Sequence, residues 1–213
     1  MSEVYHNDEN SMERPTILSE IKKEIQNSKI GTVFVPIDFV LLTDKKTASV
    51  SLSRLEKEKI VLKIMRGVYY KAEYNEFLEE YVAPEPDAVA HAIARNYGWT
   101  IVPFGDTALN ILGLSTQVPA TWVYMSDGTY KEYSYNQTTI RFKKTSNKEI
   151  SKLSYKTALV VQALKTLGKD NVKDTIITKL KNTLTDKEKE TLLIEAKAVT
   201  SWIYEYIKVI CRS

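Results

Sequence analysis

Several residue types are scarce in this chain of 213 residues, which has one cysteine, two histidines, seven glycines and six prolines. A single cysteine, Cys211, excludes an intramolecular disulfide and a cysteine-rich zinc site. No apolar run approaches the roughly 20 residues that a membrane-spanning helix needs. The first residues also lack the apolar core of a secretory signal peptide. We therefore expect a cytoplasmic protein that does not span a membrane.

Catalytic motifs are also missing. The two histidines, His6 and His91, lie in a polar N-terminal stretch and in an alanine-rich segment. The sequence contains no HExxH, no glycine-rich phosphate loop and no GxSxG. An enzyme acting on nucleic acid would have to depend on isolated carboxylates such as Asp106 or Asp127. We expect that the protein is not an enzyme and holds no cofactor or metal.

The charge is distributed unevenly, although the net charge is only +3. Residues 15–72 hold 11 Lys and Arg against 6 Asp and Glu, and residues 151–213 hold 12 against 7. The segment between them, 81–150, holds 6 of each sign. A local excess of cations is the form of charge that indicates nucleic-acid binding.

The N-terminal pattern has a recognisable order of elements. Residues 1–14 are polar and aperiodic, which predicts a disordered tail. Residues 15–75 then predict a helix from Pro15-Thr16, a β-like run at 32–35, a short helix from Pro36, a longer helix from Thr47, and a hairpin turning at Arg66-Gly67. This order is that of a winged helix-turn-helix, a DNA-binding domain.

The helix from Thr47 would be the recognition helix of such a domain. Arg54 can pair with guanine and Val50 can touch a thymine methyl group, while lysines on the hairpin would reach phosphates. The predicted DNA-binding residues are Lys45, Lys46, Thr47, Ser49, Val50, Ser53, Arg54, Lys57, Lys63, Arg66 and Lys71. Two alternatives stay open: the hairpin only closes a small core, or the domain docks a protein.

The remainder predicts a second domain at 84–213, after an acidic stretch at 75–87 that reads as a helix end and linker. Residues 84–146 predict a mixed α+β part, in which Asp106 caps a short helix and three strands form a small antiparallel meander. The turns of that meander would be Asp127-Gly128 and a second turn at Asn136-Gln137. Residues 147–213 predict a helical extension. The expected fold class is α+β.

Several runs resemble a known family. LGLSTQVP at 112–119, preceded by the runs 90–95 and 99–105, resembles the second domain of AbiEi-type antitoxins, from AbiE phage-defence (type IV toxin–antitoxin) systems. The N-terminal runs GTVF, LSRL and RGVY, at 31–34, 52–55 and 66–69, resemble the winged helix of the same family. The resemblance covers about residues 17–145. Family members usually have a glycine after the recognition helix, where this chain has Lys59.

The resemblance implies a transcriptional autorepressor that binds inverted repeats in its own promoter. It also implies an antitoxin of an abortive-infection operon, neutralising a toxin of the nucleotidyltransferase fold without a stable complex. The runner-up interpretation is an adaptor that does not bind DNA and whose winged helix docks a protein partner.

Overall fold

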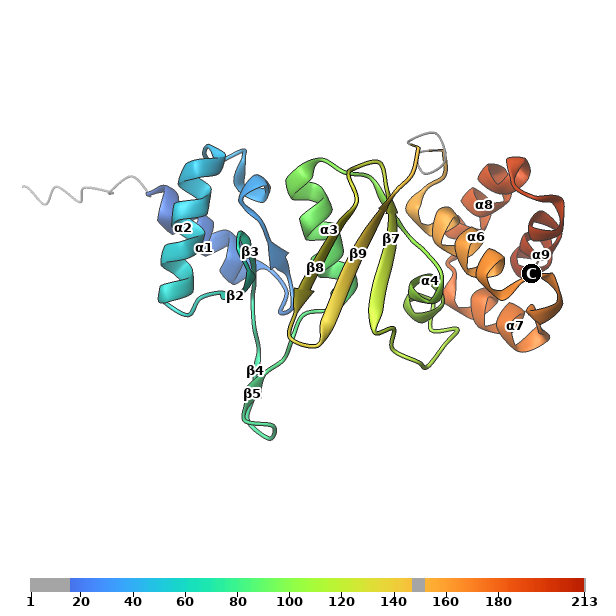
Figure 1. Cartoon of the computed structure of the whole chain (residues 1–213), viewed down its shortest axis with the longest axis horizontal. Helices are drawn as coiled ribbons and strands as arrows, with labels where there is room; N and C mark the ends of the chain where they lie inside the picture. The colour runs from blue at the N-terminus through green and yellow to red at the C-terminus, as the bar shows by residue number, and fades with distance from the viewer. Residues whose placement is uncertain (1–15, 147–151, 213) are drawn as a thin grey trace, which may run out of the picture.

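The computed structural model describes residues 16–146 and 152–212, which form a mixed α+β protein as the sequence predicts (Figure 1). Three groups of elements follow one another along the longest axis: an N-terminal group, a four-stranded sheet with its helices, and a group of C-terminal helices. The predicted disordered tail at 1–14 lies outside the described residues.

The N-terminal group has the predicted order of elements. It comprises α1 (Ile17–Asn27), β1 (Val33–Phe34), the 3-10 helix η1 (Pro36–Phe39), α2 (Lys45–Lys57), β2 (Leu62–Met65) and β3 (Val68–Tyr70). The strands form an antiparallel sheet in the order β1-β3-β2. Gly67 has φ +77° in the turn between β2 and β3, the left-handed conformation that a two-residue hairpin turn requires. Ile21, Ile25, Phe39, Leu52 and Leu55 are buried in the core of this group.

The acidic stretch that follows is a hairpin rather than the predicted helix end and linker. Strands β4 (Tyr74–Asn75) and β5 (Glu80–Tyr81) pair antiparallel, and the hairpin projects from the body (Figure 1). The turn is stabilised by Asn75, whose side-chain oxygen accepts hydrogen bonds from the backbone N–H groups of Phe77 and Leu78, both at 3.0 Å. Such Asn-backbone bonds compete with helix formation, which is why the helix prediction was wrong here.

The central group contains α3 (Pro86–Tyr97), β6 (Ile101–Pro103), α4 (Asp106–Ile111), β7 (Thr121–Ser126), β8 (Lys131–Tyr135) and β9 (Thr138–Lys144). Its strand order is β6-β7-β9-β8, and β7 pairs with β9 in parallel. The predicted antiparallel meander is therefore wrong, although β8 and β9 do form a hairpin at Asn136, which has φ +48°. Helix α4 also differs from prediction, because its N-cap is Gly105 and not Asp106.

The Asp127-Gly128 pair explains the error in strand order. A tight hairpin with this dipeptide needs a left-handed glycine, and Gly128 does not have positive φ. Asp127 instead accepts a hydrogen bond from the Thr100 N–H at 2.8 Å. A Cβ built on Gly128 would lie 2.3 Å from ring atoms of Trp99. A glycine is thus needed at this position because the backbone lies close to an aromatic ring. The chain continues from here to β8, but β7 and β8 do not pair with each other.

Helix α3 joins the N-terminal and central groups. Its buried residues Val89, Ala90, Ala92, Ile93 and Ala94 belong to one core that includes β1 and β3 on one side and β7 and β9 on the other. The guanidinium of Arg95 pairs with Asp38 of η1, with Nε and Nη2 at 2.9 and 3.1 Å from the two carboxylate oxygens. Arg95 Nη2 also donates to the Val33 carbonyl.

The C-terminal group is helical, as predicted. It contains α6 (Tyr155–Leu167), η2 (Lys169–Asn171), α7 (Asp174–Thr183), α8 (Asp186–Glu195), η3 (Ala196–Ala198) and α9 (Ser201–Cys211). Its core also includes Ala108 and Leu112 of the α4 region, which attaches the helices to the sheet. Within 16–146 and 152–212, no helix combines the length and the apolar character needed to cross a bilayer.

A Gly128→Ala substitution tests the close approach to Trp99. The ring is held by Tyr97, stacked at 4.7 Å between centroids, and by Phe142 at 5.6 Å, so it has little room to move. We expect a loss of about 1–3 kcal/mol in the free energy of unfolding, measured by urea denaturation. Thr129→Ala, at the exposed neighbouring position, should change it by less than about 0.5 kcal/mol. Equal stability of both variants would contradict the packing described here.

Candidate nucleic-acid interface

The candidate interface is built on α2, whose start is fixed by Asp44. The Asp44 carboxylate accepts hydrogen bonds from the N–H groups of Lys46 and Thr47, at 2.8 and 3.0 Å, and from the Thr47 hydroxyl at 2.7 Å. The helix therefore begins at Lys45, two residues before the predicted start at Thr47. The hydrogen bond from the Thr47 side chain, followed by those from the backbone, lowers the pKa of Asp44, so the cap is retained until acidic pH.

One face of α2 is buried and the opposite face is exposed. Ala48, Ser51, Leu52 and Leu55 point into the core. Around the other side, Lys46, Thr47, Val50, Arg54 and Lys57 are exposed, and Ser49 and Ser53 are half-buried. Val50 is 48% exposed, so its side chain is available for contact from outside the fold.

Three of the predicted residues make contacts within the fold. Lys45 Nζ donates to the Asn96 carbonyl at the end of α3, at 3.2 Å. Lys71 Nζ donates to the carbonyls of Gln26 and Ser28 at the end of α1, at 2.6 and 2.8 Å. The Thr47 hydroxyl is bound to Asp44. Sequence reasoning missed the roles of Lys45 and Lys71 because their partners are backbone carbonyls whose positions depend on tertiary structure. It missed the local bond between Thr47 and Asp44 because it began the helix at Thr47.

The β2–β3 hairpin is short and its second strand is fully buried. Tyr69 belongs to the core beneath α2, whereas Val68 and Tyr70 belong to the core shared with α3. Strand β3 therefore contributes to two cores, and closing a core is the role that one of the two open alternatives gave this hairpin. Lys63 of β2 and Arg66 of the turn are nevertheless exposed.

The cations of α2 and of the hairpin lie on consecutive elements joined by residues 58–61. Within the described ranges, no carboxylate forms an ion pair with Lys46, Arg54, Lys57, Lys63 or Arg66. Unpaired guanidinium and ammonium groups beside small hydroxyls and one methyl-bearing side chain form a surface suited to phosphates and base edges.

The end of α2 has the hydrogen bonds of a Schellman motif. The Lys59 N–H donates to the Glu56 carbonyl, and the Ile60 N–H donates to the Leu55 carbonyl. Lys59 occupies the position where this motif favours glycine, and its φ is +58°. The connection between α2 and the hairpin is thus held in a conformation that is unfavourable for lysine.

A cluster that the sequence did not predict surrounds Asp87. Its carboxylate accepts hydrogen bonds from the hydroxyls of Tyr124, at 2.8 Å, and of Tyr155, at 3.3 Å, and His91 Nε2 lies 3.7 Å away. Burial lowers the pKa of His91 more than the carboxylate raises it, and burial raises the pKa of both tyrosines. The cluster ties α3 to β7 and α6. Among the described residues, no three His, Cys, Asp or Glu side chains gather in a way that could hold a metal ion.

The chain is similar to a protein family and to a solved structure. A family model described as "Family of unknown function (DUF6088)" matches residues 20–192. No curated protein matches the chain. The crystal structure of the RV2827C protein from Mycobacterium tuberculosis is 11% identical, with a TM-score of 0.37, and the match covers 92% of this chain and 76% of that one. A likeness at this level supports no argument about function.

A Lys59→Gly substitution tests the strained end of α2. Glycine adopts positive φ without steric cost, so we expect the free energy of unfolding to rise by about 1 kcal/mol, measured by urea denaturation. Lys59→Ala serves as the control, because it removes the same charge and keeps the Cβ, and it should give no such rise. A destabilised glycine variant would contradict the left-handed conformation of this residue.

Proposed function

The chain belongs to the DUF6088 family, whose function is unknown, and we propose that it is a DNA-binding autorepressor. The observation that carries the proposal is the exposed face of α2, where Lys46, Arg54 and Lys57 have no carboxylate partner among the described residues. The core-facing residues of α2 hold the helix in place, so the helix does not have to reorganise before its exposed face binds a partner.

The order of elements supports a winged helix-turn-helix. In this interpretation η1 and α2 are the helix-turn-helix, α2 is the recognition helix and the β2–β3 hairpin is a short wing. Arg54 would pair with a guanine and Val50 would contact a thymine methyl group in the major groove. Lys63 and Arg66 would contact phosphates, which contribute affinity without sequence information.

The set of contacting residues is smaller than the sequence suggested. Lys45 and Lys71 donate to backbone carbonyls, and Thr47 is bound to the helix cap. We propose that these three residues hold the interface in place and do not contact DNA. Lys46, Ser49, Val50, Ser53, Arg54, Lys57, Lys63 and Arg66 remain as the residues proposed to touch DNA.

The antitoxin role is the second part of the proposal and rests on the resemblance of LGLSTQVP to AbiEi-type antitoxins. In this chain the segment follows α4 and leads into β7. Gln117 N–H donates to Ser115 Oγ and Asn110 donates to the Gln117 carbonyl, so these polar groups largely shape the loop. The protein would neutralise a nucleotidyltransferase-fold toxin encoded beside it, without a stable complex, and would catalyse nothing itself.

Fluorescence anisotropy with the duplex upstream of the gene tests the DNA-binding role. We expect binding roughly a thousandfold or more tighter than to a scrambled duplex, and weaker at higher salt. Arg54→Ala should weaken binding to the upstream duplex by roughly 10-fold to 100-fold. Lys63→Ala/Arg66→Ala should weaken binding to both duplexes and lower the slope of log affinity against log salt by roughly two.

Lys173→Ala removes an exposed cation near the start of α7 and serves as the matched control, with unchanged affinity expected for both duplexes. Equal and weak binding of wild-type protein to both duplexes would sink the repressor proposal. Salt-insensitive binding to a protein partner, without DNA, would then favour the adaptor interpretation.

A further inference from the structure

The hairpin formed by β4 and β5 exposes an unusual amount of apolar surface. We call residues 73–82 the arm. Phe77 at its tip is 94% exposed and Leu78 is 56% exposed, and Tyr74, Tyr81 and Val82 are also exposed. Five exposed apolar side chains within ten residues form a patch of the kind that marks an interaction site.

The arm is held in a defined shape. The Asn75 side chain accepts hydrogen bonds from the N–H groups of Phe77 and Leu78, and the Val82 N–H donates to the Glu73 carbonyl. The rings of Tyr74 and Tyr81 meet edge to face at 5.1 Å between centroids. A two-stranded hairpin is only marginally stable alone. These contacts preorganise the tip, so little ordering entropy is lost when it binds.

The charge of the arm restricts the partner. Its ten residues contain Glu73, Glu76, Glu79 and Glu80 and no lysine or arginine. Four carboxylates around an apolar tip repel nucleic acid and anionic lipid. They favour an apolar receptor with a basic rim.

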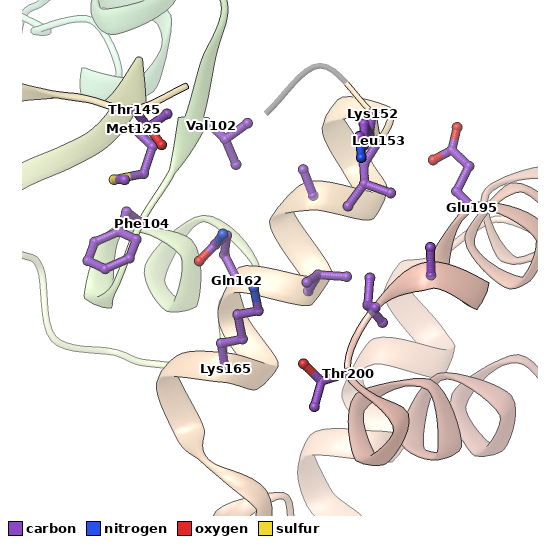
Figure 2. Close-up of a pocket in the computed structure, with 14 residues that line it drawn as sticks. Val102, Phe104, Met125, Thr145, Lys152, Leu153, Gln162, Lys165, Glu195 and Thr200 are labelled. Carbon is purple, nitrogen blue, oxygen red and sulfur yellow. The ribbon is translucent and has the colours of Figure 1, made fainter. Parts of the chain in front are cut away.

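The described residues contain a receptor of that chemistry. A cleft of about 840 Å³ lies between the four-stranded sheet and the C-terminal helices. Apolar side chains line much of it, among them Val102, Phe104, Met125, Leu153, Val161 and Val199 (Figure 2).

Two of the residues that line the cleft are cations, and a third cation lies beside it. Lys152 and Lys165 line it, and Lys143 Nζ lies 5.6 Å from the centre of the Phe104 ring. Glu195 also lines the cleft, but its carboxylate accepts hydrogen bonds from the N–H and hydroxyl of Ser154, at 2.9 and 2.7 Å. Neither Lys152 nor Lys165 forms an ion pair with any carboxylate in the described part of the chain.

The arm and the cleft of one chain are at different places in the molecule. The arm leaves the body beside the N-terminal group, and the cleft opens where the sheet meets α6 (Figures 1 and 2). The sheet and α3 lie between them (Figure 1). An arm that fills this cleft therefore comes from another copy.

We propose that the arm of one copy docks in the cleft of a second copy, in a two-fold dimer that exchanges both arms. Phe77 and Leu78 enter the apolar floor, and Glu76 and Glu80 face Lys152 and Lys165. Two-fold symmetry forms each contact twice, which doubles the buried apolar surface. This dimer does not depend on the DNA-binding role, because neither surface includes α2.

Sedimentation velocity of the full chain at micromolar concentrations tests the dimer. Wild-type protein should be dimeric, and Phe77→Asp/Leu78→Asp should raise the dimer dissociation constant at least tenfold. Leu41→Asp is the matched control, because Leu41 is an apolar side chain, 96% exposed, outside the arm and the cleft. It should leave the dissociation constant unchanged.

Charge reversal separates the proposed contact from a folding defect. Glu76→Lys/Glu80→Lys and Lys152→Glu/Lys165→Glu should each dissociate the dimer, and all four positions are exposed. Mixing the two variants, or combining them in one chain, should restore it. A wild-type monomer, a dimer insensitive to the arm-tip variant, or charge reversals that do not compensate would each overturn the proposal.

Discussion

The packing of α3 against two sheets is the constraint on which the rest of the structure depends. The alanines of α3 allow neighbouring elements to approach closely. The buried residues of α3 lie around a wide arc of the helix, so that a sheet packs on each side of it. Asp38 reinforces this junction, because its carboxylate binds Arg95 and also accepts the Val35 N–H at 2.9 Å. The N-terminal group, which includes α2, is therefore fixed to the central sheet. The central group in turn packs against the C-terminal helices.

This arrangement separates surfaces of opposite charge. The exposed face of α2 and the β2–β3 turn carry cations, whereas the arm, which begins just after β3, carries four glutamates. Anions attracted to one surface are repelled by the other. The two partners that we propose accordingly differ in chemistry: DNA at α2, and an apolar cleft with cations at the arm.

Much of the fold follows from local pattern, and the errors in the strand order and in the roles of two lysines arise where tertiary contacts decide. Periodic apolar residues located the helices, and Gly67 located the first hairpin. Asp127-Gly128 misled the strand order, because Trp99 is what requires that glycine. Of the candidate site, the exposed α2 residues were predictable from periodicity. The roles of Lys45 and Lys71 were not, because their partners are backbone carbonyls 51 and 43–45 residues away in sequence.

The central claim is that the exposed face of α2 and the β2–β3 turn contact DNA. Hydrogen–deuterium exchange of the full chain, with and without the upstream duplex, tests it directly. The account predicts slower exchange on DNA binding in α2 and in residues 62–67, with little change in α7 and α8. Protection confined to the C-terminal helices, with α2 unchanged, would contradict it.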